Sequence, residues 1–168
     1  MAHIDYTKID RLAAMAAWAK VAATNQSAES LYSNNRKDIS ANLAKLMTDY
    51  RDRDMNNIVV TLQADALGYR CAYVEEIAVM MRNYAKVNNH IKKITGDRRE
   101  FYATGFGLKL GHAQVAELMD RDLSEWQTQI AIFEVHIQFL RESVKTCDQI
   151  GYAIKNRIEL LRHTFAQQ

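Results

Sequence analysis

The C-terminal third of the chain contains the stretch MDRDLSEWQTQIAIFEVHIQFLRESVKTCDQIGYAIKNRIELLRHTF, residues 119–165. Alternating steps of four and three through it meet an apolar residue at every position except one glycine. The row is Met119, Leu123, Trp126, Ile130, Phe133, Ile137, Leu140, Val144, Cys147, Gly151, Ile154, Ile158, Leu161 and Phe165. A repeat of about 3.5 residues sustained over this length predicts one α-helix whose apolar stripe supercoils around partner helices.

A helix over this stretch extends roughly 70 Å, at about 1.5 Å per residue. Most of its stripe therefore needs other helices to cover it. Gly151 interrupts the stripe, and the missing side chain allows a bend or the close approach of a neighbouring helix. We expect residues 119–147 to pack within the subunit. The row beyond the glycine is expected to join subunits: Ile154, Ile158, Leu161 and Phe165.

The composition favours an all-helical fold. The 168 residues are 48% hydrophobic and 25% charged, which is typical of one ordinary globular domain. Proline is absent and only six glycines occur, so the chain lacks the residues that usually punctuate strands and turns. We predict an all-α protein with a long helical hairpin, a coiled-coil-like C-terminal helix and smaller N-terminal helices.

The smaller helices are predicted in the first sixty residues. Residues 5–23 are alanine-rich, and the polar run at 24–35 predicts a connector with room for one turn of helix. Asp38 and Ser40 are alternative caps for the helix that follows. That helix has apolar residues at four-three-four spacing and ends at a charged break, residues 51–57.

A second long periodic segment lies in the middle of the chain. Residues 58–62 are β-branched enough for a short strand, but no second strand-like run could pair with them, so we predict the start of a helix. Residues 64–95 form the long helix. Its core row is Tyr73, Ile77, Met80, Tyr84, Val87, Ile91 and Ile94. The run GFGLKLG, residues 105–111, predicts the loop that returns the chain antiparallel to the C-terminal helix.

No constellation of side chains suits catalysis. The five histidines show no ligand pair with a third partner, and the glycines at 105 and 107 follow no strand, so we predict neither a metal site nor a phosphate loop. His136 flanks the C-terminal row, where a solvated or interfacial histidine is common. We expect a protein that is not an enzyme and needs no cofactor or metal.

The cysteines and the N-terminus favour a cytoplasmic location. Cys71 and Cys147 lie far apart in apolar-periodic stretches and predict buried thiols in a reducing compartment. The first ten residues carry Asp5 and Asp10 without a long apolar core, so we predict no signal peptide. No window reaches the ~18 apolar residues that a membrane span requires.

A basic cluster stands out because the formal net charge is only +2. Within residues 82–112 the cations are Arg82, Lys86, Lys92, Lys93, Arg98, Arg99 and Lys109, against Asp97 and Glu100. Phe101, Tyr102 and Phe106 lie beside them. Cations that grip phosphates next to rings that stack on bases are what single-strand binders combine. The alternative is that the cations solvate a helix end while the aromatic rings cap the core.

Three segments carry a family resemblance. FLRESVKTCDQIGYAIKNRIELLRHTF, residues 139–165, contains a pattern like I-K-N-x-I-E followed by a basic residue and Phe. The matching residues are Ile154, Lys155, Asn156, Ile158, Glu159, Arg162 and Phe165. REFYATG at 99–105 is similar to a basic, acidic, Tyr-Tyr-Thr/Ser-Gly element, and LMDRDLSEWQ at 118–127 is acidic and leucine-bearing. Taken in their order along the chain, the three segments resemble the UvsY family of phage recombination mediators. The resemblance covers about residues 62–165.

The resemblance implies a small helical protein that forms a ring-like homo-oligomer, a hexamer or heptamer, and binds single-stranded DNA. Family members help a RecA-like recombinase displace the single-strand DNA-binding protein. DNA binding is implied for Lys92, Lys93, Arg98, Arg99 and Tyr102. Residues 101–105 have one residue more than the family element, so Arg98 and Arg99 remain alternatives for the main contact. A phage protein of this kind would act in the host cytoplasm.

The resemblance also suggests a division of the chain. Residues 61–168 would form the DNA-binding and oligomerisation region, and residues 1–60 an N-terminal helical extension of unknown role. A competing hypothesis is a non-enzymatic scaffold or assembly protein that only oligomerises through its C-terminal coiled coil. It predicts the same helices and the same oligomer, without any dependence on DNA.

Overall fold

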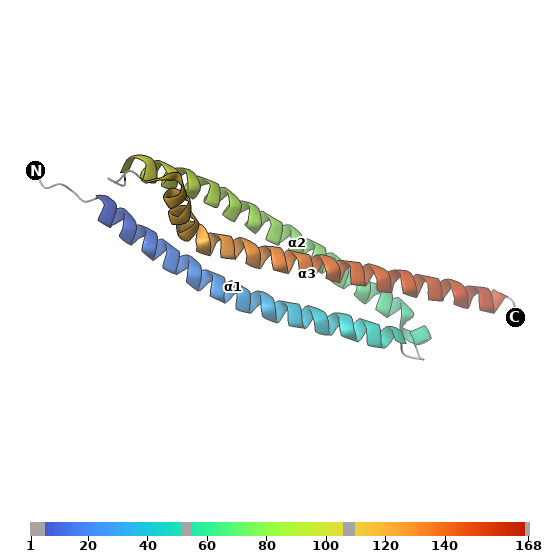
Figure 1. The fold of residues 1–168 in the computed structure, drawn as a ribbon. Helices are drawn as coiled ribbons and strands as arrows, with labels where there is room; N and C mark the ends of the chain where they lie inside the picture. Colours follow the sequence, from blue (N-terminus) through green and yellow to red (C-terminus); the bar gives the residue numbers. More distant parts are fainter. Residues whose placement is uncertain (1–5, 52–54, 106–109, 167–168) are drawn as a thin grey trace, which may run out of the picture. The chain divides into compact units, whose positions relative to one another are not determined.

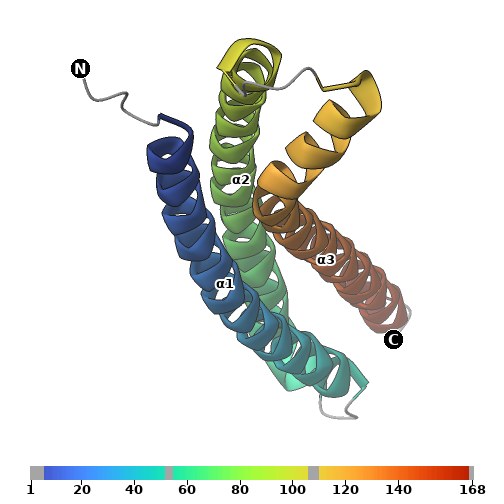
Figure 2. The same ribbon diagram turned by 60° about the vertical axis from the view of Figure 1, so that its left-hand side comes forward.

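The computed structural model describes residues 6–51, 55–105 and 110–166. The elements are α1 (Tyr6–Arg51), α2 (Met55–Glu100), a short π-helical turn η1 (Phe101–Gly105) and α3 (His112–Ala166). Each long helix is unbroken in two views (Figures 1 and 2). The predicted all-α class is confirmed, and the described ranges contain no strand.

The N-terminal part differs from the prediction, because α1 is one helix of 46 residues. The connector expected at 24–35 is wrong, and with it the caps at Asp38 or Ser40. Both residues lie in the interior of the continuous helix. The run from 24 to 35 contains neither proline nor glycine, so nothing in its backbone chemistry forces the helix to stop.

The polar side chains of this run find partners that leave the helix intact. Thr24 donates its hydroxyl to the carbonyl one turn earlier in α1 at 2.9 Å. Asn25 donates to the backbone carbonyl of Glu125 at 2.7 Å, and Asn35 donates to the carboxylate of Glu76. Residues that favour turns when they bond their own backbone are therefore used here to bind α2 and α3.

The predicted apolar rows of α2 and α3 are confirmed. Every described side chain of the α3 row is buried or half-buried, and Leu140 is 0% exposed. The core row of α2 is covered in the same way. Residues 58–62 lie in α2 and not in a strand. Of the predicted loop 105–111, residues 106–109 lie outside the described residues.

The chain forms two compact units, and each takes segments from all three helices. The first comprises residues 1–31 with 82–134, and the second residues 32–81 with 135–168. The predicted boundary near residue 60 does not coincide with this division, because α1 contributes to both units.

The contacts within each unit give the directions of the helices. In the first unit Tyr84 donates to Glu134 at 3.2 Å, while Arg98 lies near Asp122, much later in α2 and earlier in α3. These pairs run in opposite order along the two helices. The antiparallel arrangement of α2 and α3 predicted from the sequence is therefore confirmed in this unit.

The core of the second unit has a cluster of buried residues from all three helices. Leu46 comes from α1, Leu62 and Ala66 from α2, and Ile150 and Ile154 from α3. Each is at most 3% exposed. Burial of this apolar surface is the main favourable term that holds the three segments together.

This cluster corrects the prediction that the end of α3 joins subunits. Ile154 is 0% exposed, and Ile158 packs against the same cluster. Both therefore belong to the core of their own chain, because the uninterrupted α1 reaches far enough to cover this part of α3. Leu161 is half-buried, and the side chain of Phe165 lies outside the described residues. A role for these two in assembly stays a prediction.

A polar layer crosses the second unit beside the apolar core. His136 is 0% exposed, and its Nε2 lies 2.9 Å from a carboxylate oxygen of Glu76. Its ring stacks on Tyr32 with centroids 4.5 Å apart. Burial and the neighbouring Glu76 raise the pKa of Tyr32 above its ordinary value. Of the two alternatives expected for His136, the solvated one is thus wrong, because α1 and α2 both contact its ring and leave it no exposed surface.

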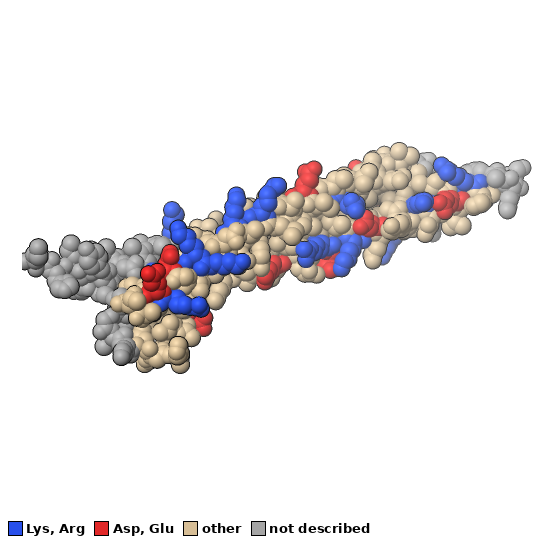
Figure 3. All heavy atoms as spheres, turned by 90° about the horizontal axis from the view of Figure 1, so that it is seen from above, with Lys and Arg blue, Asp and Glu red and all other residues tan. Residues whose placement is uncertain are grey.

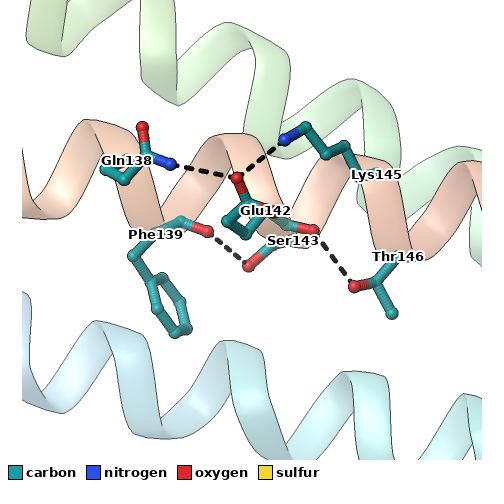
Figure 4. Close-up of polar contacts among 6 residues, drawn as sticks. All are labelled: Gln138, Phe139, Glu142, Ser143, Lys145 and Thr146. Carbon is teal, nitrogen blue, oxygen red and sulfur yellow. Dashed lines mark hydrogen bonds and ion pairs between the residues drawn. The ribbon is translucent and has the colours of Figure 1, made fainter.

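α3 satisfies several polar side chains by itself (Figure 4). The buried Ser143 donates its hydroxyl to the carbonyl of Phe139 at 2.9 Å. On the exposed side, Glu142 accepts hydrogen bonds from Gln138 at 3.0 Å and from Lys145 at 2.8 Å. The buried serine therefore requires no partner from another helix.

The two cysteines have different environments. Cys147 is buried, as predicted, but Cys71 is exposed, so that prediction is wrong for Cys71. Cys71 lies two residues before the buried Tyr73, on a side of α2 that no other described segment covers. The apolar row that contains it is a second row on α2, distinct from the core row.

The burial of Ile154 can be tested by truncation. Ile154→Ala should lower the free energy of unfolding by about 2–5 kcal/mol, because it removes a fully enclosed side chain and leaves a cavity. Leu160→Ala, at a residue that is 68% exposed, should change it by less than about 0.5 kcal/mol. Chemical denaturation measures both. If Ile154→Ala lowers the mass of the protein in solution and leaves its free energy of unfolding unchanged, Ile154 lies at a subunit interface and not in the core of its own chain.

Candidate nucleic-acid interface

Six of the predicted basic residues lie in the C-terminal half of α2 and differ in exposure. Five of them are exposed on this helix: Arg82, Lys86, Lys92, Lys93 and Arg99. Arg98 is half-buried, and Tyr102 is buried in η1 at 6% exposure. Lys109 lies outside the described residues. The sequence prediction therefore separates into an exposed group and a group that contributes to packing.

Three of the exposed cations form a line along α2. Arg82, Lys86 and Lys93 lie within about 40° of one another around the axis, at about 100° per residue, and span roughly 16 Å. We call these three the basic stripe. Lys92 and Arg99 are seven residues apart and follow a second line, about 100° around the helix from the stripe. This regular presentation follows from the helix itself and requires no contact with another element.

Acidic residues limit the extent of this surface. Asp97 and Glu100 are exposed and follow the stripe on the same side of α2. On the face drawn in Figure 3, Lys and Arg side chains are interspersed with acidic ones. The favourable surface for a phosphate chain is thus a short local line on one helix, in agreement with the small net charge of +2.

Aromatic and polar contacts with α3 fix this segment. The rings of His90 and Trp126 meet edge to face with centroids 4.6 Å apart, and Tyr84 donates to Glu134. Tyr84 belongs to the core row of α2, whereas the exposed His90 lies one turn after Lys86, so its contact with Trp126 borders the basic stripe. Arg82 and Lys93 lie on the side of α2 opposite the core row, at about 100° per residue.

Tyr102 and Arg98 converge on one carboxylate. Tyr102 donates its hydroxyl to Asp122 Oδ2 at 2.6 Å, and Arg98 Nε lies 3.7 Å from the same oxygen. The Arg98 guanidinium also lies over the ring of Phe101, 5.8 Å from its centroid. Burial, and then the hydrogen bond to Asp122, raise the pKa of Tyr102 to about 12. The three residues attach the end of α2 and η1 to α3.

These contacts correct two predicted roles. A ring that is 6% exposed offers no face to a base, so the prediction that Tyr102 stacks on DNA is wrong for this arrangement. Arg98 has a side chain only 17% exposed beside Asp122, whereas Arg99 is exposed. Of the two alternatives for the main contact, Arg99 is the one accessible to a ligand.

Asp122 was not predicted as a site residue, although the spacing of the residues that follow it is informative. Gln129, His136, Ser143 and Ile150 follow Asp122 at intervals of seven, and these four are all buried. Each precedes a residue of the predicted apolar row by one position. This second line shows that α3 is covered by two helices, which makes its buried face wider than a two-stranded seam.

Other classes of site find no support in the described part of the chain. It contains no group of three or more His, Cys, Asp or Glu side chains that could hold a metal ion. None of its helices has a stretch long and apolar enough to cross a bilayer. No protein-family model, curated protein or solved structure matches this chain. Function is therefore inferred from the arrangement of its own side chains.

The role of Tyr102 can be tested by removing its hydroxyl. A pKa raised from about 10 to about 12 means that the neutral phenol stabilises the folded state fully below pH 10, and that this contribution is lost as the pH rises through 12. Tyr102→Phe should cost about 1 kcal/mol at neutral pH and show a smaller loss of stability between these pH values. Denaturant unfolding across this range is the measurement.

Tyr152→Phe is the matched control, because Tyr152 is 70% exposed. It should follow the wild-type pH dependence. Burial also raises the pKa of Tyr73 to about 12, and both variants retain this residue. Both should therefore still lose some stability as the pH rises from 10 to 12. An identical pH dependence for Tyr102→Phe and wild type would contradict the proposed bond.

Proposed function

We propose that this protein binds single-stranded DNA through the C-terminal half of α2. The observation that supports this most is the group of five exposed cations on one helical segment, three of which form the basic stripe. Phosphate contacts from a row of Lys and Arg supply the sequence-independent part of nucleic-acid affinity. The contacts are Arg82, Lys86 and Lys93, with Lys92 and Arg99 on the second line of the same helix.

The biological role proposed with this binding is that of a recombination mediator, as the resemblance to the UvsY family implies. Such a protein helps to load a RecA-like recombinase onto DNA covered by single-strand DNA-binding protein. A loader has to bind DNA that carries the recombinase and DNA that carries the single-strand DNA-binding protein with different affinities. Equal affinity for both would leave the balance between them unchanged. In this proposal the chain acts without catalysis, as a homo-oligomer that repeats the stripe and so raises its effective strength.

The DNA-binding step is tested with a charge-matched pair of variants. R82A/K86A/K93A removes the stripe, and K37A/K45A/K155A removes three exposed cations elsewhere on α1 and α3. Both lower the net charge by three. Affinity for a labelled single-stranded oligonucleotide is measured by fluorescence anisotropy across a range of salt concentrations.

The stripe variant should bind more weakly, and its slope of log affinity against log salt should fall by about two, because each phosphate that it no longer neutralises accounts for about 0.7 of the slope. The control should keep nearly the wild-type slope. Equal weakening in the two variants would show that only net charge matters. Wild-type protein that fails to bind at low salt would exclude the proposal and leave the scaffold hypothesis.

A further inference from the structure

α2 carries a second apolar row that its own chain leaves exposed. Val60, Leu67, Val74 and Met81 are spaced seven residues apart and are 75%, 58%, 43% and 49% exposed. A spacing of seven places them on one line of the helix. Single exposed apolar residues are common on protein surfaces, but a continuous line of large ones marks an interaction surface.

Small apolar residues fill the intermediate positions of this line. Ala64, Cys71 and Ala78 each lie three residues before the next large residue, and all three are exposed. The seven positions from 60 to 81 therefore step alternately by four and three, which is the pattern of a coiled-coil seam over three heptads. We call these seven residues the outer seam. All of them belong to the second compact unit.

We propose that the outer seam is a parallel two-stranded coiled-coil interface between two copies of this chain. A stripe with a repeat of about 3.5 residues stays in register only with a helix of the same repeat, and a second copy supplies it. Covering the seam on both copies buries on the order of 1,000 Å² in total, which reaches the range of a specific interface.

Charges beside the seam favour the parallel orientation. Arg70 and the exposed Glu75 flank it on opposite sides, five residues apart. In a parallel pair, these flanking positions of the two copies meet, so Arg70 of one copy faces Glu75 of the other. In an antiparallel pair, the side of the seam with Arg70 would instead meet the same side of the other copy, and Arg70 would not face Glu75. Arg70 already donates Nε to Asp148 at 2.6 Å, and a guanidinium has further N–H donors for a second carboxylate.

The outer seam and the basic stripe share no residue, so this interface does not depend on the proposed DNA binding. It places self-association on α2, whereas the sequence pattern predicts it at the end of α3. Its test uses the protein without DNA. The variant K86A/K93A leaves Arg82 beside the seam unchanged and should still associate, so the two proposals can fail separately.

The first experiment compares two variants that each add two negative charges seven residues apart. L67E/V74E places them in the outer seam, and A72E/V79E places them on exposed positions beside it. Mass in solution is measured by sedimentation at tens of micromolar protein, and far-ultraviolet circular dichroism checks that each variant is helical. Both pairs are exposed in the single chain, so both variants should fold.

Wild type and A72E/V79E should have the mass of two chains, and L67E/V74E should have the mass of one, with self-association weakened at least tenfold. Wild-type protein with the mass of a single chain would overturn the proposal. So would a helical L67E/V74E variant that keeps the wild-type mass.

The second experiment tests the orientation with a cysteine placed at one end of the seam, in the variant C71S/M81C. A parallel pair places position 81 of both copies in one layer, at a separation that a disulfide can span, whereas an antiparallel pair over the same seam separates them by roughly 30 Å. Added diamide should then oxidise the two thiols, taking up two electrons and two protons, and give a covalent dimer. Cys71→Ser alone should give no product, because Cys147 is 2% exposed and protected from the reagent. Association without this cross-link would overturn the parallel arrangement.

Discussion

The apolar row of α3 has to stay covered over the whole length of a 55-residue helix, and the other helices are placed by this requirement. A repeat of about 3.5 residues keeps one side of the helix apolar along its length, so no single short element can shield it. α1 and α2 are each 46 residues long and supply segments to both compact units. Their length is what allows α3 to bury residues as late as Ile154.

The same packing determines what the candidate interface can present. α2 contacts α3 through its core row, which includes Tyr84, so the cations of the basic stripe are left on the opposite side of the helix. Asp122 then draws Arg98 and Tyr102 into the contact between α2, η1 and α3. The result separates residues that anchor the segment from residues that remain accessible to a ligand, although all of them come from one cluster in the sequence.

α2 differs from α3 in carrying two apolar repeats of the same period. The row with Tyr73 and Met80 is buried within the chain, whereas the row with Leu67 and Val74 is exposed. Both have the four-three spacing that supports helix pairing. A helix with two such faces can pack within its own chain through one face and bind a helix of another chain through the other.

The sequence by itself determined the helical class through its composition, and the core rows of α2 and α3 through their repeat of about 3.5 residues. The glycine-rich run at 105–111 determined the antiparallel pairing of these two helices in the first unit. The sequence could not decide the continuity of α1. Asn25 and Asn35 favour a connector locally, and only the tertiary structure supplies Glu125 and Glu76 as partners that keep the helix intact.

The burial of individual site residues was also decided by tertiary structure. Tyr102 and Arg99 belong to the same basic and aromatic run, and no local pattern says that one is enclosed and the other exposed. Asp122 makes that difference from another helix. Periodicity reports which face of a helix is apolar, but burial depends on how many neighbours cover that face, which is a property of the packed chain.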